Sequence, residues 1–232
     1  MPDKPSFLSY DLHIHSCLSP CADDDMTPGN ILGMAALIGL DIIALTDHNS
    51  CKNCPAIVRL AEDFPLQVIP GMELTTAEEV HVLCYFCNLE DAISFDTYVE
   101  QHLLPIPNQT ELFGNQLLCD EQDNICGTYE NLLITATDIS FFQLGEVLTA
   151  YNGFMVPAHM DKKSNSLLSQ LGFVPENCGF TCFEVHNMDE AARLRSKYPI
   201  LKECEVLCSS DAHRLDALHE KTYFLKNGIF PV

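Results

Sequence analysis

Short apolar runs alternate along the chain with segments whose apolar residues recur at helical spacing. The run Leu40–Thr46 is apolar enough to be a strand buried on both faces. The same pattern predicts further strands at Phe7–His13, Leu66–Pro70, Val80–Phe86, Phe154–Ala158, Thr181–Val185 and Glu205–Ser209, with a short last strand at Thr222–Leu225. Because strands that alternate with helices are typical of parallel sheets, we expect an α/β fold.

Helix signals fill most of the intervals between these strands. Thr27 followed by Pro28 is typical of an N-cap and a first helical turn, and this helix is predicted to end near Gly39. Asp138 is a candidate cap for a helix that reaches Tyr151. Further helices are expected at Pro55–Glu62, Asp91–Leu104, Ser164–Leu171 and Asp189–Lys197.

Residues 105–130 depart from this alternation because they are polar and irregular. Within them, two short apolar runs flank the polar segment Asp120–Asn124. Such a pattern predicts an inserted β-hairpin near residues 115–130.

Composition narrows the class of protein. A chain of 232 residues is long enough for one sizeable core, so we expect a single domain over residues 1–232. Its net charge of −21 argues against a protein that follows a nucleic-acid polymer or an anionic membrane surface. A small anionic substrate is still compatible with this net charge, since bound metal cations would make the local electrostatic potential positive. The longest nearly apolar run, Ile31–Leu40, is too short to span a bilayer, and no signal peptide is evident, so a cytoplasmic location is expected.

Twelve cysteines without a secretory signal indicate a reducing compartment. Two pairs, Cys51–Cys54 and Cys84–Cys87, have metal-ligand or redox spacing, and Cys17 and Cys21 are also close in sequence. Buried free thiols have the same appearance and are more common than an additional metal site.

Histidines gather around the ends of the predicted strands. Seven of the nine lie at, just past or within a strand. His13 and His15, two residues apart, would point to the same face because side chains alternate along a strand. In a barrel of β/α units the carboxyl ends of the strands converge on one face, where active sites lie. The strand-end series therefore predicts one pocket built from distant segments.

Together these residues resemble the PHP (polymerase and histidinol phosphatase) domain family. The resemblance extends over nearly the whole chain, and its carriers are Asp11–His15, Leu45–His48, Pro70–Glu73, Val80–Leu83, Pro157–His159 and Ser210–His213. It implies a single PHP domain folded as a distorted seven-stranded β/α (TIM-like) barrel. It also implies a phosphoesterase with two or three divalent metal ions, for which mixed imidazole and carboxylate ligands suit Zn, Mn or Fe.

The same resemblance implies the ligands of each metal. The first metal would be held by His13, His15, Glu73 and Asp211, and Glu73 would bridge to a second metal bound by His81 and His159. A third would be bound by His48, His213 and a residue of the loop after His15. Related chains often place an aspartate where this chain has Pro20, so Asp23 takes the role by its spacing from Thr27–Pro28. Asp24, Asp25 and Cys21 are the open alternatives.

Other catalytic and binding roles are assigned less directly. His13, His15, Glu73 and Asp211 would form the catalytic metal centre, and His186, at a strand end, is either a catalytic pocket residue or structural. Lys162, Lys163 and Arg214 follow ligand motifs and are candidates for binding substrate phosphate, or are solvated surface charges. Asp47 is expected to orient a ligand rather than to bind metal.

The sequence thus predicts a metal-dependent phosphoric ester hydrolase acting on a small phosphomonoester or nucleotide through a metal-activated water. One alternative is a PHP-type nuclease or exonuclease, which the acidic balance disfavours. Another is a noncatalytic metal-binding or redox-sensing module. The oligomeric state is left open.

Overall fold

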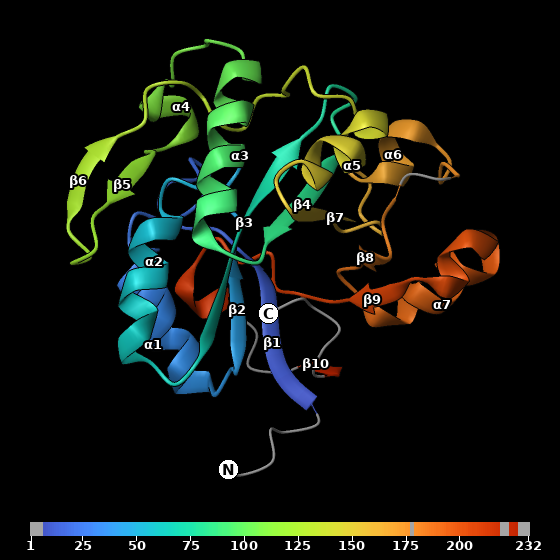
Figure 1. Cartoon of the computed structure of the whole chain (residues 1–232), viewed down its shortest axis with the longest axis horizontal. Coiled ribbons are helices and arrows are strands. Elements are labelled where there is room, and N and C mark those ends of the chain that lie inside the picture. The colour runs from blue at the N-terminus through green and yellow to red at the C-terminus, as the bar shows by residue number, and fades with distance from the viewer. Residues whose placement is uncertain (1–6, 177–178, 219–222, 227–232) are drawn as a thin grey trace.

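The computed structural model describes residues 7–176, 179–218 and 223–226, and its centre is a strongly curled six-stranded sheet (Figure 1). The α/β class is therefore confirmed. In spatial order the strands are β10 (Tyr223–Lys226), β1 (Phe7–Ile14), β2 (Ile42–Leu45), β3 (Gln67–Thr75), β4 (His81–Phe86) and β7 (Gly153–Pro157).

The direction of β4 corrects the expectation of a parallel sheet. Strands β1, β2 and β3 are parallel, but β4 is antiparallel to both β3 and β7, and β10 is antiparallel to β1. The segment between β3 and β4 is too short for a helical crossover, so the two strands form a hairpin. As a result His81, the first residue of β4, pairs with Thr75 at the carboxyl end of β3.

Two further strands, β8 (Cys182–Glu184) and β9 (Glu205–Leu207), form a separate parallel pair. A few hydrogen bonds connect the surrounding segments to the large sheet. Met160 N–H donates to the Glu184 carbonyl (2.8 Å), His15 N–H donates to the Ala212 carbonyl (2.9 Å), and Ala212 N–H donates to the His13 carbonyl (3.3 Å). Each of the paired strands has three residues, which is too short for a long ladder. The described residues therefore form a half-barrel sheet plus a pair, rather than one continuous seven-stranded ladder.

The helices follow the predicted order, with one wrong cap. Thr27 caps α1 (Pro28–Ile38) through its side chain, and Gly39 ends it with a φ of 79°. Ser140, not Asp138, caps α5 (Phe141–Thr149), because the Asp138 carboxylate instead bonds the His102 imidazole at 2.6 Å. The remaining helices are α2 (Cys54–Leu60), α3 (Leu89–His102), α4 (Thr110–Phe113), α6 (Leu167–Leu171) and α7 (Met188–Lys197), with 3₁₀ turns at Ala61–Asp63, Pro199–Glu203 and Leu215–Ala217. Within residues 7–176, 179–218 and 223–226, none of these helices is both long and apolar enough to be a membrane span.

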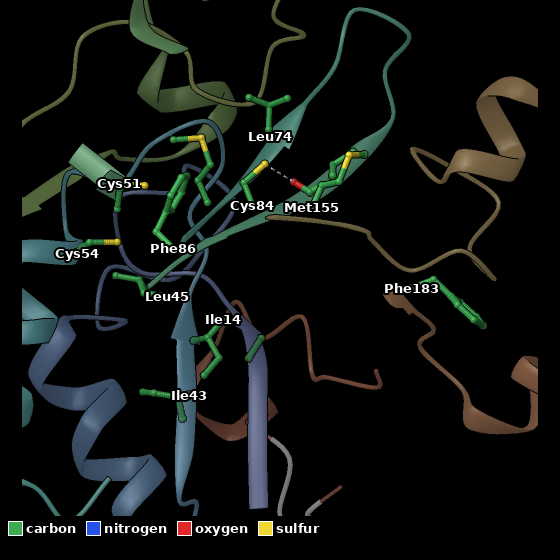
Figure 2. Close-up of a cluster of buried hydrophobic side chains, with 14 of the residues drawn as sticks. Ile14, Ile43, Leu45, Cys51, Cys54, Leu74, Cys84, Phe86, Met155 and Phe183 are labelled. Atoms are coloured by element: carbon green, nitrogen blue, oxygen red, sulfur yellow. Dashed lines mark hydrogen bonds between the residues drawn. The ribbon is translucent and has the colours of Figure 1, made fainter. Parts of the chain in front are cut away.

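Alternating strand residues face two separate apolar cores. One core lies between the sheet and the helices and includes Ile43, Leu45 and Phe86, which Figure 2 shows among its side chains. The other core consists almost wholly of strand residues, among them Ile42 and Leu83. A core lined by strands alone lies on the inner face of a curled sheet, so both faces of the sheet are buried.

The predicted hairpin is confirmed as β5 (Leu117–Cys119) and β6 (Ile125–Thr128). Leu117 N–H donates to the Cys17 carbonyl (2.8 Å), which attaches the hairpin to the loop after β1. The Asp123 carboxylate accepts from the Thr27 hydroxyl and the Gly29 amide at the start of α1. In Figure 1 the hairpin lies on the opposite side of the sheet from α7.

Candidate metal centre

Four donor atoms converge where β1 and β3 meet the segment after β9. The Nε2 atoms of His13 and His15 are 3.2 Å apart. Each lies 3.3–3.4 Å from Glu73 Oε2 and 3.4 Å from Asp211 Oδ1. Both imidazoles and Glu73 are buried, and Asp211 is nearly so. Two imidazole nitrogens and two carboxylate oxygens aimed at one point are a ligand set that fits a divalent transition metal.

The opposite nitrogen of each imidazole has its own partner. His13 Nδ1 lies 3.0 Å from Glu184 Oε2, and His15 Nδ1 lies 3.0 Å from Ser19 Oγ. The Ser19 hydroxyl in turn donates to Asp47 at 2.7 Å, so Asp47 orients His15 through a serine. When Nδ1 carries the proton toward these oxygens, the Nε2 lone pair points to the shared centre. Such contacts hold the tautomer and ring orientation that a metal ligand needs.

The Glu73 carboxylate connects this centre to a second group of imidazoles. Its Oε1 atom lies 2.9 Å from His81 Nδ1 and 3.1 Å from His159 Nε2. Its Oε2 atom lies 3.1 Å from His48 Nδ1. One buried carboxylate thus contacts donors on both sides, which is the arrangement expected of a bridging ligand.

A third group contains His15, His48 and His213. The rings of His15 and His213 stack with centroids 4.2 Å apart, and those of His15 and His48 are 4.5 Å apart. The residues nominated from the loop after β1 are elsewhere: Asp23 is half-exposed and 3.8 Å from Arg214. Among the described residues, the donor groups include none of Cys21, Asp23, Asp24 and Asp25.

Charge and burial act against each other in this cluster. Burial by itself would raise the pKa of Glu73, but the imidazoles of His81, His13 and His48 outweigh it and hold the pKa well below its usual value. Burial would likewise lower the pKa of His13, but Glu184, Asp211 and Glu73 raise it well above normal. Burial, then the charge on His15, lowers the pKa of His48. Metal ions bound among these imidazoles would stabilise the ionised carboxylates.

Glu184 is a site residue that the sequence reasoning missed. Its Oε2 atom accepts from His13 Nδ1 and also from the backbone N–H of His159 at 3.0 Å. His159 has a φ of 29°, in the left-handed region that non-glycine residues rarely adopt, and Asp211 has a φ of 54°. The available signal was a carboxylate inside the apolar run Thr181–Val185, which indicates a buried polar partner.

The centre opens into a cavity of about 160 Å³. Lys162 lines this cavity, and its ammonium group donates to Asp211 Oδ2. Asn165 also lines it, with its side-chain amide 3.1 Å from His81 Nε2. The full lining is His48, Glu73, His81, His159, Lys162, Ser164, Asn165, Asp211 and His213.

Three other nominated residues lie outside this cavity. His186 is exposed, and its backbone N–H donates to Asp161 Oδ1. Lys163 lines a neighbouring cavity instead. Arg214 is exposed and pairs with Asp216. Lys163 and Arg214 follow ligand motifs in sequence, as Lys162 does, but of these three only Lys162 lines the cavity at the metal centre.

The sequence profile of the PHP domain matches residues 11–160. The chain belongs to the PHP domain family. An uncharacterized protein of Methanocaldococcus jannaschii is 33% identical over an alignment of 79 positions that covers 31% of this chain. The match spans about half (46%) of that relative's length.

Solved structures share the fold of this PHP-domain chain. The lesion-specific endonuclease Q of Pyrococcus furiosus has a TM-score of 0.62 at 18% identity, covering 91% of this chain and 50% of its own. A protein of Bifidobacterium adolescentis described as a putative metal-dependent phosphoesterase has a TM-score of 0.60 at 17% identity, covering 91% and 89%. An amidohydrolase of Chromobacterium violaceum with bound sulfate has a TM-score of 0.60 at 15% identity, covering 93% and 91%. At these identities the likeness establishes the fold alone.

Proposed function

We propose that this PHP-domain chain is a metal-dependent phosphoesterase that hydrolyses a small phosphomonoester or nucleotide. The observation that carries the proposal is the convergence of imidazole nitrogens on both oxygens of the buried Glu73 carboxylate. This donor set opens directly into a cavity of about 160 Å³, enough for a phosphoryl group. In this proposal β1, β2, β3, β4, β7, β8 and β9 are the seven strands of the family's distorted barrel, and β10 is an addition at its edge.

The ligand assignment keeps the first two sites as the sequence predicted them and revises the third. In our proposal the first site uses His13, His15, Glu73 and Asp211, and the second uses Glu73, His81 and His159. A third is supplied by His48 and His213 beside His15, with Asp23 omitted because of its exposure. Bound divalent ions would supply an ionised water and offset the charge that develops on the phosphate oxygens. The donor set suits Zn, Mn or Fe.

The chain's own residues then position the substrate. Lys162, which lines the cavity and already contacts a carboxylate, would bind a nonbridging phosphate oxygen. Glu184 and Ser19 hold the rings of His13 and His15, so that their donor atoms need no reorganisation when substrate binds. The Asn165 side-chain amide contacts Nε2 of His81 from the cavity wall and restrains the orientation of that ring.

Hydrolysis of an aryl phosphate by the purified, metal-loaded chain is the direct test. We expect activity that a chelator removes and that added divalent metal restores. His13→Ala should lose metal while keeping its circular-dichroism spectrum. A fully metal-loaded protein that hydrolyses nothing across a broad phosphoester panel would contradict the proposal and would favour a noncatalytic metal-binding module.

A nuclease is the second candidate, because the structural neighbours include endonuclease Q with a 27-mer duplex carrying an abasic lesion. This chain spans about half the length of that protein. With 12 basic against 33 acidic residues, the chain has little charge with which to follow a nucleic-acid backbone. Cleavage of oligonucleotides in preference to mononucleotides would support the nuclease.

A further inference from the structure

A second cavity, of about 410 Å³, adjoins the metal centre between the segment after β7, helix α6 and helix α7. Lys162 lines both cavities, so the two meet at its side chain. Three more basic residues, Lys163, Arg193 and Lys197, line the second cavity. These four are a third of the 12 lysines and arginines in a chain of net charge −21. The proposed hydrolysis gives a role to Lys162 but none to the other three.

The positive charge of this cavity is only partly neutralised. Arg193 bonds the half-buried Glu190 on the preceding turn of α7, and Lys197 lies 5.0 Å from the centroid of the Tyr198 ring. Within residues 7–176, 179–218 and 223–226, neither Lys163 nor Lys197 has a carboxylate within ion-pair distance.

The carboxylate of Asp161, which also lines this cavity, does not offset the positive charge fully. Asp161 accepts the backbone N–H groups of His186 and Asn187 with its two oxygens, at 2.8 and 2.9 Å. Both oxygens of this carboxylate therefore already have backbone donors in the turn before α7. The rest of the lining includes Met160, Leu168 and Leu194, so the cavity offers apolar surface as well as cationic groups.

We propose that this cationic cavity binds a second anionic group of the substrate, while a phosphomonoester occupies the metal centre. The preferred substrates are then small molecules with two anionic groups, a scissile phosphate and a distal phosphate or carboxylate, joined by a short, partly apolar body. The inference rests on the proposed phosphoesterase function. It follows from charge-assisted hydrogen bonds, which give cationic side chains their selectivity for phosphate and carboxylate.

Chain-length series of simple alkyl phosphates test this directly. We would compare α,ω-alkanediol bisphosphates of two to eight carbons with ω-hydroxyalkyl monophosphates and ω-carboxyalkyl monophosphates of equal length. The preference is the ratio of kcat/KM for the doubly anionic to the singly anionic substrate. We expect the wild type to prefer one length by tenfold or more, and Arg193→Gln/Lys197→Gln to lower that preference by about tenfold. Comparison of the bisphosphates with the ω-carboxyalkyl monophosphates shows whether the cavity prefers a distal phosphate or a distal carboxylate.

The matched control is Arg59→Gln/Lys202→Gln, which removes the same two charges from exposed positions outside both cavities. It should keep the wild-type preference. An equal loss in both double variants would assign the effect to overall charge, and a wild type without any preference would overturn the proposed subsite.

Failure of the enzyme function is recognised separately. If the wild type hydrolyses neither series, the phosphoesterase proposal is wrong. Calorimetric titration of the metal-loaded protein with the same bisphosphates and monophosphates then tests whether the second cavity binds an anionic group. Tighter binding of a bisphosphate that weakens about tenfold in Arg193→Gln/Lys197→Gln supports the subsite. Equal affinity for both series in the wild type contradicts it.

Discussion

Two sets of buried side chains in this protein have metal-ligand chemistry, and only one is arranged as a site. The imidazoles and carboxylates around Glu73 direct their donor atoms to shared points, and the opposite ring nitrogens of His13 and His15 bond other groups. The thiols of Cys51 and Cys54 instead approach one backbone carbonyl, that of Gly71, at 3.2 and 3.5 Å.

Burial also disfavours the thiolate, which is the metal-binding form, at two of these cysteines. Burial raises the pKa of Cys51 and of Cys84 far above the usual value. Cys84 is buried but Cys87 is exposed, so this pair with metal-ligand spacing does not share an environment. The Sγ atoms of Cys17 and Cys119 are 3.6 Å apart, and all the cysteines in the described residues are free thiols.

Residue type and spacing are therefore weaker indicators of a metal site than convergence of the donor atoms. Donor atoms form a site when they meet at one point and when buried polar groups fix their orientation. Thiols that pack against an apolar core, as Cys51, Cys54 and Cys84 do in Figure 2, behave as small hydrophobic side chains. Three sets of substitutions test this contrast, and a fourth probes a contact away from both sets.

Glu73→Gln should have the largest effect. Loss of the carboxylate that contacts five imidazoles should lower kcat/KM for an aryl phosphate by about 1,000-fold or more, or about 4 kcal/mol of transition-state stabilisation. Steady-state kinetics with excess metal measures it. The control, Glu79→Gln, removes a carboxylate from the exposed turn between β3 and β4 and should keep wild-type rates. Equal rates in both variants would remove Glu73 from the site.

Glu184→Gln should weaken metal binding by about 10- to 100-fold without unfolding the chain. Its carboxylate is the partner of His13 Nδ1 and of the strained His159 backbone. Competition with a chromophoric chelator measures the affinity. Glu205→Gln, at the exposed start of β9, is the control. Unchanged affinity in Glu184→Gln would show that ring orientation does not depend on this contact.

Replacing the thiols should lower the stability of the fold without changing the metal content. Cys51→Ala/Cys54→Ala removes two buried side chains from the core, so we expect a loss of about 1–2 kcal/mol in the free energy of unfolding. Urea denaturation gives the stability, and elemental analysis should give the wild-type metal content. A lower metal content would mean that this pair forms a site after all.

The smallest expected effect is electrostatic and lies away from both sets. Glu78 accepts from the Ser140 hydroxyl and the Phe141 N–H at the start of α5. Burial alone would raise the pKa of Glu78, but these hydrogen bonds outweigh it and lower the pKa from its usual 4.5. A lowered folded-state pKa stabilises the fold above about pH 4.5 and loses this contribution as the pH falls further.

Glu78→Gln should therefore lower Tm by about 2 °C at pH 7, with a difference from wild type that shrinks below pH 4.5. Thermal melts at several pH values measure it. A difference that stays constant between pH 3 and pH 7 would mean that the contact acts through shape rather than charge.

Local signals predicted much of this fold. The Thr27–Pro28 start and the Gly39 end of α1, the inserted hairpin and the order of most elements were read from nearby residues. The antiparallel direction of β4 was missed, because hydrophobic pattern carries no strand direction. The cap of α5 was misassigned, because Asp138 has a distant partner in His102 that no local rule reveals.

The candidate site divides in the same way. Residues at the strand ends, such as His13 and Glu73, were identifiable because topology alone brings those ends together. Glu184 was not, since its role depends on a contact between β8 and β1 that only the folded chain provides. The exposed Asp23 was nominated by spacing in a loop whose path no sequence rule specifies.

The number and position of bound metals would decide whether the residues around Glu73 form the metal centre. A crystal of the metal-loaded protein, measured by anomalous scattering at the metal edge, should contain two to three metal ions within ligand distance of Glu73, His13 and His81, and none at Cys51 or Cys54. An empty cluster at saturating metal, or anomalous density at the thiols instead, would contradict the central claim that convergence around Glu73 makes the site.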